Sequence, residues 1–164
     1  MGTTFDSAKF RQVLGHVPTS VVVVTGRGTD GTPHGITIGS FVSVSLDPPL
    51  VGFLPGLSSR SWAEIAASGR FCVNVLADGQ EDLCWRFAKE ADDRFAGLEW
   101  NDSPNGMPEL PGCVATIDCS IHSQIERGDH YMVVGHVLSL DNIHDAGDAM
   151  AFYKGKVTRA VSVR

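Results

Sequence analysis

Short runs of β-branched and aromatic residues, each ended by a turn signal, recur along most of this chain. The most regular run alternates from His34 to Leu46 and is stopped by Asp47-Pro48-Pro49, a sequence that does not continue a strand. The other strand-like runs are Thr19–Thr25, Leu50–Leu54, Phe71–Leu76, Val114–Glu126, Tyr131–Asp141 and a last basic segment that ends at Arg164. Many short strands with frequent turns favour an antiparallel barrel or sandwich over a doubly wound parallel sheet. We therefore expect a mainly β fold, a β-barrel with a few short helices.

Helical signals are confined to short segments. A first amphipathic helix, ending near Gly15 or Pro18, is indicated by the i, i+3, i+4, i+7 spacing of Phe10, Val13, Leu14 and Val17. Capping-box spacings predict two more helices, which begin at Ser61 with Glu64 and at Asp78 with Glu81 and end at Gly69 and near Ala88. A short helix is also expected over 148–153, and a long loop over 98–112.

Length and composition place the chain among globular proteins. Its 164 residues are 43% apolar and 20% charged, which is typical of a folded rather than a disordered chain. We expect residues 1–164 to form a single domain. The four cysteines show no Cys-x-x-Cys spacing, which favours reduced thiols over a zinc site or a disulfide.

Charge and hydropathy argue against two classes of partner. The formal net charge of −6 does not attract a phosphate backbone, so no nucleic-acid partner is expected. Residues 1–12 lack the apolar run of a signal peptide, and the longest apolar stretch, Val21–Val24, is too short to cross a bilayer. We therefore expect a cytoplasmic protein with no membrane partner.

The sequence does not support a dinucleotide-binding fingerprint, a metal-ligand motif or a serine-nucleophile motif. Residues 26–31 have the Gly-x-Gly-x-x-Gly spacing of a dinucleotide fingerprint and follow a strand. That motif needs a helix to begin within it, whereas Pro33 and the alternating segment continue as strand, so we expect a hairpin turn. The six histidines show no His-x-x-x-His spacing, and no Gly-x-Ser-x-Gly sequence occurs. Neither a metal site nor a serine nucleophile is expected.

Alternation along His34–Leu46 sorts its side chains onto two faces of a strand. The face expected to join the core carries Ile36, Ile38, Ser40, Val42, Val44 and Leu46. The opposite face carries Thr37, Gly39, Phe41, Ser43 and Ser45. Small hydroxyl residues, a glycine and an aromatic ring suit a planar ligand that forms hydrogen bonds, but they are also ordinary on an exposed strand. The pattern alone leaves both interpretations open.

Ser58–Ser61 lies where a loop enters a predicted helix. The unpaired N–H groups and the positive end of the helix dipole attract anions there, and three hydroxyls with one guanidinium add donors suited to a phosphate. The alternative is structural, with Ser61 as the N-cap and Arg60 as a solvated charge.

His130 directly follows Gly128-Asp129 at the expected start of a strand. A Gly-Asp pair is first of all a turn signal, and a lone histidine has many uses. His130 is therefore either a functional side chain or part of the turn.

In their order along the chain, these segments resemble the flavin reductase family, the reductase components of two-component flavin monooxygenases. The most specific segment is His34–Leu50, and the resemblance extends over residues 8 to 160. The other matching segments are Val17–Thr25, Ser59–Ser61, Gly69–Leu76, Gln80, Phe87–Ala88, Asp93–Phe95, Gly128–His130 and Phe152–Lys156. The ordered set, rather than any one segment, carries the resemblance.

The resemblance implies a split β-barrel of antiparallel Greek-key strands that binds FMN or FAD as a homodimer, with the flavin near the subunit interface. Members use NADH or NADPH to reduce flavin, which then reaches a separate flavin-dependent oxygenase by diffusion. By position, the isoalloxazine ring and ribityl chain would contact Thr37, Ile38, Gly39, Ser40 and Phe41. The phosphate would be held by Ser59, Arg60 and Ser61, with Ser58 beside them. Phe87 would lie close to the flavin, and His130 would help to seat the nicotinamide.

Two positions depart from the family's pattern. Gly39 stands where relatives commonly carry Asn or Ser, so only backbone can form a hydrogen bond there. Ser61 stands where Thr is usual, which keeps the hydroxyl.

The chain is therefore expected to be an NAD(P)H-dependent flavin reductase. The cofactors carry the hydride chemistry, so no general base is needed, and we expect His130 to position the nicotinamide rather than transfer a proton. One alternative is a flavin-binding electron carrier without fast nicotinamide turnover. Another is a split-barrel oxidase of the pyridoxamine-phosphate type, which would need a basic cluster beyond Arg60. The choice of flavin, of nicotinamide and of partner oxygenase stays open at this point.

Overall fold

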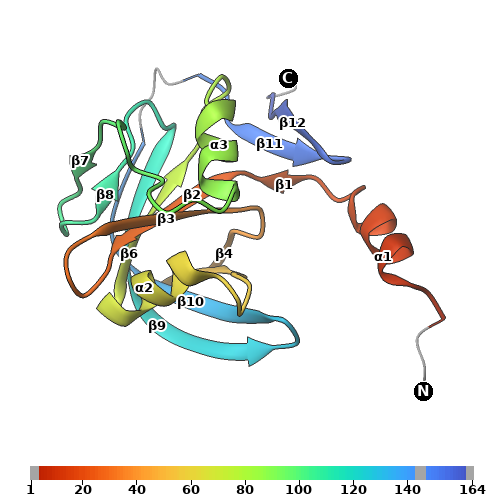
Figure 1. Ribbon diagram of the computed structural model, residues 1–164, viewed down its shortest axis with the longest axis horizontal. Helices are drawn as coiled ribbons and strands as arrows, with labels where there is room; N and C mark the ends of the chain where they lie inside the picture. The colour runs from red at the N-terminus through yellow and green to blue at the C-terminus, as the bar shows by residue number, and fades with distance from the viewer. Residues whose placement is uncertain (1–3, 143–146, 162–164) are drawn as a thin grey trace.

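A seven-stranded antiparallel sheet forms the body of the molecule in the computed structural model, which describes residues 4–142 and 147–161 (Figure 1). Its strand order is β3-β2-β6-β9-β10-β5-β4, and each pair of neighbours is antiparallel. The strands are β2 Val22–Arg27, β3 Pro33–Ile38, β4 Val42–Leu46, β5 Pro49–Phe53, β6 Arg70–Val75, β9 Ala115–Arg127 and β10 His130–Asn142. The prediction of a mainly β, antiparallel fold with few helices is confirmed.

Two small sheets and three helices complete the fold. One sheet has the order β1-β11-β12, and the other pairs β7 with β8. Their bounds are β1 Thr19–Ser20, β11 Met150–Tyr153, β12 Lys156–Arg159, β7 Asn101–Asp102 and β8 Pro108–Glu109. The helices are α1 Ser7–Leu14, α2 Arg60–Ser68 and α3 Glu81–Ala88. Both α2 and α3 pack against β2 and β3, whereas α1 extends away from the barrel (Figure 1). No helix in the described part of the chain is long and apolar enough to cross a membrane.

The strand β2 is buried on both sides, which explains the uninterrupted apolar run that begins at Val21. One of its faces, with Val22 and Val24, joins a core cluster with Trp62 and Ile65 of α2. The other side places Val21 and Val23 in a second cluster that includes Cys84 and Phe87 of α3. Because each helix covers one side of the strand, no position of the run faces water.

The alternating segment 34–46 is not one strand, and its predicted core face is wrong in its second half. Strand β3 ends at Ile38, which is 4% exposed, and β4 begins at Val42. In β4, Val42 is 54%, Val44 50% and Leu46 91% exposed. The reason is that β4 lies at the edge of the sheet, beyond the bend at 39–41, where none of the described residues covers that face.

Three further expectations need correction. The predicted helix over 148–153 is wrong: Met150–Tyr153 form strand β11, because Ala151 and Phe152 pair with β1. The N-cap of α3 is Gln80, not Asp78. The last strand ends at Arg159 rather than Arg164, and residues 162–164 lie outside the described part of the chain.

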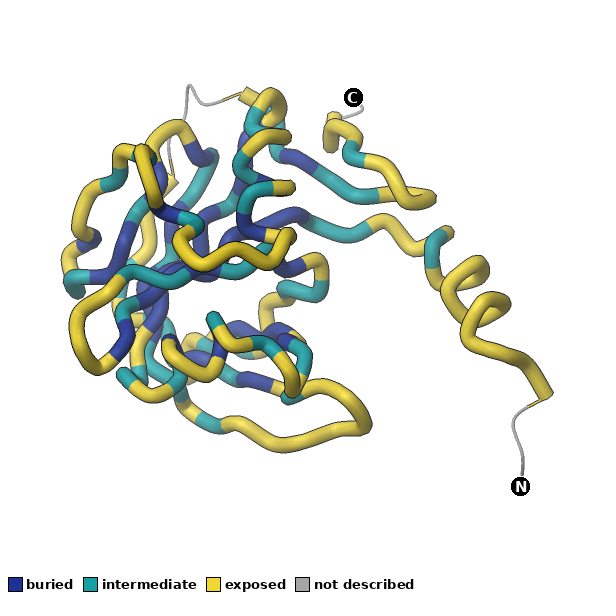
Figure 2. Tube along the Cα trace, in the orientation of Figure 1, coloured by how far each residue is buried: buried dark blue, intermediate teal, exposed yellow. Residues whose placement is uncertain are grey.

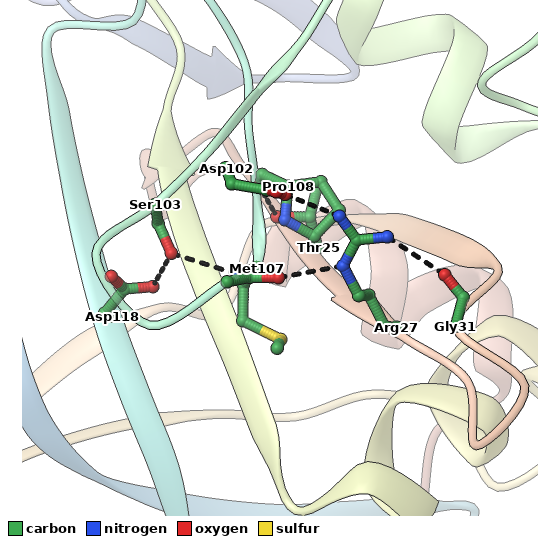
Figure 3. Close-up of polar contacts among 9 residues, drawn as sticks. Thr25, Arg27, Gly31, Asp102, Ser103, Met107, Pro108 and Asp118 are labelled. Carbon is green, nitrogen blue, oxygen red and sulfur yellow. Dashed lines mark hydrogen bonds and ion pairs between the residues drawn. The ribbon is translucent and has the colours of Figure 1, made fainter.

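Residues 98–112 are more ordered than the predicted loop, because they contain the β7–β8 hairpin and polar contacts fix them to the barrel (Figure 3). Arg27 of β2 forms an ion pair of 2.5 Å with Asp102. The Ser103 hydroxyl donates to Asp118 Oδ1 of β9 at 2.7 Å, and Asp118 is only 3% exposed. Hydrogen bonds of this kind satisfy polar groups that would otherwise be costly to bury.

Other predictions are confirmed. Helix α1 ends at Leu14, with Gly15 as its C-cap. Gly69 ends α2 in the left-handed conformation at φ 75°. The glycine-rich segment 26–31 runs from the last two residues of β2 into the turn of the β2–β3 hairpin. All four cysteines are free and buried.

Candidate functional site

Residues Ser58–Ser61, here called the serine loop, lie at the end of the loop between β5 and α2 and in the first turn of α2. Their serines are therefore close to a helix N-terminus. The N-cap of α2 is Ser59, whose hydroxyl oxygen accepts from the backbone N–H of Trp62 at 3.2 Å. The prediction that Ser61 is the N-cap is therefore wrong by two residues. Ser61 lies in the first turn of α2, so its hydroxyl is available for other contacts. The first turn combines this hydroxyl with unpaired N–H groups, which together favour an anion.

A cavity of about 280 Å³, here called the serine-loop cavity, opens beside this loop. Six of the residues proposed from the sequence line it: Thr37, Ser58, Ser59, Arg60, Ser61 and Phe87. They come from β3, the serine loop, the start of α2 and α3. The fold thus brings together side chains as far apart in the chain as Thr37 and Phe87.

Thr37 of β3 and Phe87 of α3 line the cavity together with the serine loop. The Thr37 hydroxyl donates to the backbone oxygen of Cys84 at 2.6 Å, so its oxygen remains available as an acceptor. Phe87 is fully buried and meets Phe95 edge-on at a ring separation of 5.1 Å. A Cβ atom at Gly35 would lie 2.6 Å from the Phe87 ring, so the glycine permits this close approach.

Four sequence-predicted residues do not line the serine-loop cavity. Ile38 is buried in the core, and Phe41 packs against the same cluster. Ser40 accepts from the backbone N–H of Leu54 at 2.9 Å, which ties the bend after β3 to the end of β5. Gly39 is exposed at this bend, where an added Cβ would lie 3.3 Å from Thr19 Oγ1. In the single chain, Ile38 and Phe41 therefore belong to the core, and Gly39 and Ser40 belong to the bend.

His130 lies outside the serine-loop cavity but is joined to its loop. It pairs with Gly56, a lining residue, through an isolated β-bridge. The backbone oxygen of Asp129 accepts from Leu57 N at 3.0 Å. The His130 ring contacts Asp129 Oδ1 through Nδ1 at 2.7 Å, and this hydrogen bond lowers the pKa of the Asp129 carboxyl. The imidazole is half-exposed and held by its neighbour in the turn.

Arg94 is the functional candidate that sequence reasoning missed. Its Nη1 donates to Ser61 Oγ and to the backbone oxygen of Gly35, both at 2.8 Å, and its Nε donates to Lys89 O at 2.7 Å. Burial lowers the pKa of the guanidinium, which nonetheless stays charged. The only signal was its place in the Asp93–Phe95 segment, because a lone arginine in a loop does not indicate which hydroxyl it will reach.

The two guanidiniums beside the serine loop differ in their surroundings. Arg60 is 80% exposed and lies 3.6 Å from Glu90, which is 82% exposed. An exposed pair of this kind contributes little to stability, so Arg60 is free to exchange Glu90 for another anion. Arg94, by contrast, is fixed by three hydrogen bonds.

A second cavity of about 580 Å³ adjoins the first. We call it the Trp100 cavity, and it is lined by Thr32–Gly35, Arg60, Ser61, Glu64, Ala91–Phe95 and Trp100. Although it is the larger, it lacks Thr37, Ser58, Ser59 and Phe87, so the sequence-predicted residues gather in the smaller cavity.

Outside these two cavities, we considered metal-binding groups and reactive thiols among the described residues. Within 4–142 and 147–161, no group of three or more His, Cys, Asp or Glu has the geometry to hold a metal ion. The buried thiols of Cys113 and Cys119 have pKa values raised to about 12 by burial, so they stay protonated at neutral pH.

Nearly the whole chain is similar in sequence to known flavin reductases. The family described as "Flavin reductase like domain" matches residues 14–160. A flavin reductase of Pseudomonas putida is 49% identical over 153 residues, covering 93% of this chain and 89% of that protein. The reductase subunit HsaB of a flavin-dependent monooxygenase from Rhodococcus jostii is 46% identical, covering 93% of this chain and 77% of that protein.

Solved structures of related reductase components have the same fold. Nitrilotriacetate monooxygenase component B from Mycobacterium thermoresistibile superposes with a TM-score of 0.90 at 41% identity, covering 95% of this chain and 87% of that one. The NADH:FAD oxidoreductase SgcE6 of Streptomyces globisporus, in complex with NAD and FAD fragments, has a TM-score of 0.89 at 34% identity. That match covers 98% of this chain and 96% of the other.

Proposed function

The chain belongs to the flavin reductase-like family, and from this premise we propose that it transfers a hydride from NADH or NADPH to FMN or FAD. It is an oxidoreductase with the split-barrel fold of its structural relatives. We propose that residues 1–164 act as one domain and deliver reduced flavin to a separate oxygenase. Two relatives that are named as a monooxygenase reductase subunit and a monooxygenase component support such a partner.

The observation that carries the proposal is the convergence of Thr37, Phe87 and the serine loop on one cavity at the start of α2. The residues present there fit a riboflavin phosphate. Two guanidiniums, from Arg60 and Arg94, and the helix N-terminus offer positive potential where a phosphate would lie. Apolar and hydroxyl groups line the remainder, which suits a planar ring with polar edges.

The hydrogen bonds that Ser61 and Thr37 already form leave one hydroxyl free to donate and the other free to accept. Ser61 Oγ accepts from Arg94, which leaves its own proton free to donate to a phosphate oxygen. The Thr37 proton is used by Cys84 O, so Thr37 Oγ1 can accept from an N–H group at the edge of a ring. The Ser58 hydroxyl and Arg60 add donors at the phosphate end. We propose that Ile38, Gly39, Ser40 and Phe41 contact the flavin mainly through backbone.

A bound flavin would supply the hydride acceptor, and this chemistry needs no proton transfer from a side chain. The protein's contribution is to bind, orient and exclude water. We propose that His130 positions the nicotinamide beside the loop that carries Gly56. The hydrogen bond to Asp129 fixes the orientation of the imidazole and uses Nδ1, which leaves Nε2 for a ligand.

We also propose that the chain works as a homodimer with the flavin near the interface. Helix α1 buries none of its residues against the barrel (Figure 2). Its apolar side chains Phe10, Val13 and Leu14 are each about half exposed. The edge strand β4 adds Val42, Val44 and Leu46 to the exposed apolar surface. Apolar surface of this extent is typical of an interface.

The proposed activity is tested by mixing the purified protein with NADH or NADPH and free FMN or FAD in the absence of oxygen. We expect the visible absorbance of the flavin to bleach at a rate proportional to protein concentration. A reaction without protein serves as the control. If none of the four combinations bleaches while flavin still binds, the reductase proposal is wrong and an electron carrier is favoured.

A further inference from the structure

The segment 89–100, which follows α3, carries Arg94 but contains no helix or strand of its own. The structure describes every residue of this segment, from the end of α3 at Ala88 to the start of β7 at Asn101. Without a regular ladder of backbone hydrogen bonds, such a segment is held by contacts with the rest of the protein. Arg94 lines both the serine-loop cavity and the Trp100 cavity, so these contacts also determine where its guanidinium lies.

Arg86, in the last turn of α3, supplies two of these contacts. Its Nε donates to the backbone oxygen of Arg94 at 2.7 Å, and its Nη2 donates to the backbone oxygen of Ala96. A planar guanidinium presents its donors in a fixed arrangement, so one side chain can bind two carbonyls that are two residues apart. Arg86 is partly buried and lines neither cavity, so a ligand bound there would not touch it.

Arg94 reaches back to the end of the same helix. Its Nε donates to the backbone oxygen of Lys89 at 2.7 Å, while its Nη1 donates to Ser61 Oγ and to Gly35 O. The two arginines thus bind the backbone at both ends of the segment 89–94, because Arg86 holds the carbonyl of Arg94 and Arg94 holds the carbonyl of Lys89. The position of the Arg94 guanidinium therefore depends on a contact made by Arg86.

The aromatic contact beside these hydrogen bonds does not replace them. Phe87 meets Phe95 at a ring separation of 5.1 Å, and Phe95 is 6% exposed. This packing fixes the Phe95 ring in the core, but rotation about the backbone bonds of Arg94 would still carry its side chain away from Ser61. The two carbonyls that Arg86 binds flank Phe95 in the chain, so their hydrogen bonds restrict that rotation.

We propose that Arg86 is a positioning residue for the flavin phosphate, because it fixes the backbone of residues 94–96 and thereby directs the Arg94 guanidinium to the Ser61 hydroxyl. This inference rests on the proposed function, in which Ser61 and Arg94 hold that phosphate. Arg86 acts through Arg94 rather than by contact with the ligand. Its effect is therefore confined to phosphorylated flavins and does not extend to riboflavin, which has the same ring and ribityl chain but no phosphate.

The test compares the equilibrium affinities for FMN and riboflavin, measured by fluorescence titration, in the wild type and in the variants Arg86→Gln and Arg86→Lys. We expect the wild type to bind FMN about tenfold or more tightly than riboflavin, and Arg86→Gln to weaken FMN about tenfold with riboflavin unchanged. Lysine keeps the charge but not the planar pair of donors, so Arg86→Lys should recover only part of the loss. It also keeps the test valid if Arg86→Gln does not fold.

The control variant is Arg127→Gln. Arg127 is exposed, donates to the backbone oxygen of Glu126 and lines neither cavity, so its variant loses the same charge and a similar hydrogen bond. Both flavin affinities should stay at their wild-type values in this protein.

A double variant separates positioning from general support of the fold. Arg86→Gln combined with Arg94→Ala should bind FMN no more weakly than Arg94→Ala alone, because Arg86 has no effect once the guanidinium that it positions is absent. A residue that only stabilises the fold would weaken riboflavin and FMN alike, and its effect would add to that of Arg94→Ala.

Three outcomes would overturn the assignment. They are equal losses for FMN and riboflavin in Arg86→Gln, additive losses in the double variant, and full recovery by Arg86→Lys, which would mean that charge alone suffices. Equal affinities of the wild type for FMN and riboflavin would remove the phosphate site and the inference with it. Failure of the proposed reductase activity is distinguishable, because it appears as bound flavin that NADH and NADPH do not reduce in any of the proteins.

Discussion

The Arg94 guanidinium donates a hydrogen bond of 2.8 Å to the hydroxyl of Ser61, and this contact joins the loop before Phe95 to the first turn of α2. The same nitrogen donates to Gly35 O of β3. Arg94 thereby connects three separate segments at the wall between the serine-loop cavity and the Trp100 cavity. A side chain that both supplies charge and orients a neighbouring hydroxyl is expected to affect any phosphate bound there.

Arg94→Ala should weaken FMN and FAD alike, by about 10- to 100-fold, because it removes one charge and leaves Ser61 without its donor. Arg94→Lys should recover only part of the loss, since an ammonium on a flexible stem does not reproduce the planar guanidinium geometry. Fluorescence titration of the flavin provides the measurement, and Arg127→Ala on the exposed β9–β10 turn is the control. Full rescue by lysine would contradict the orienting role.

His130→Ala should raise the nicotinamide KM or lower the rate of flavin reduction by about tenfold, with flavin affinity unchanged. The reason is that His130 lies outside the serine-loop cavity and touches it only through its pairing with Gly56. Stopped-flow reduction at several NADH concentrations separates binding from the hydride step. The control is His122→Ala, an exposed residue of β9. Unchanged kinetics in the His130 variant would remove the residue from the site.

Gly35→Ala should destabilise the fold by about 1–3 kcal/mol, because the added methyl would lie 2.6 Å from the Phe87 ring. Phe87 is fully buried and in contact with Phe95, so it has little room to move. Thermal unfolding by circular dichroism measures the loss. Gly56→Ala, where an added Cβ meets nothing within 4 Å, provides the comparison for stability. A melting temperature equal to that of the wild type would contradict this prediction, because it would mean that α3 moves away from β3 and makes room for the methyl group at no cost.

Most strands are predicted correctly because their sequence signals are local. The prediction fails where a contact with a residue distant in the chain determines the secondary structure. Alternation continues unbroken through residues 34–46, yet the chain bends where Ser40 accepts from Leu54 N, a contact between residues 14 positions apart. A short helix is expected over 148–153, but pairing with β1 makes Met150–Tyr153 a strand. Such pairings depend on tertiary context, which overrides local preference.

The same distinction applies to the candidate site. The serine loop carries a local motif, so its residues were identified, although the N-cap is Ser59 rather than Ser61. The capping-box spacing of Ser61 and Glu64 is equally regular and does not reveal which serine caps the helix. Arg94 lies in the family-like segment Asp93–Phe95, but no residue pattern there indicates its partner, which becomes evident only when the fold places Arg94 Nη1 2.8 Å from Ser61 Oγ.

Glu109→Gln should raise the melting temperature at neutral pH and have little effect in acid. Burial, and then the negative charge of Asp118, raise the pKa of the Glu109 carboxyl above its usual value of 4.5. The folded state therefore binds this proton more tightly than the unfolded state, so wild-type stability falls as pH rises from 4.5 through the raised pKa. Glutamine does not ionise and avoids that loss. Melting curves across this range provide the measurement, and a variant less stable at every pH would contradict the expectation.

Val13→Glu should convert the proposed dimer to a monomer of 17.5 kDa, because Val13 is 51% exposed on a helix that buries nothing against its own barrel. A charge placed in an apolar interface costs several kcal/mol when it has no partner there. Sedimentation velocity measures the mass, and Gln12→Glu, an exposed neighbour on the same helix, adds the same charge as a control. Since Val13 contributes nothing to the barrel core, the melting temperature at high dilution should not change. A wild-type protein that sediments at 17.5 kDa at all concentrations would contradict the dimer, and the exposed face of α1 would then need another explanation.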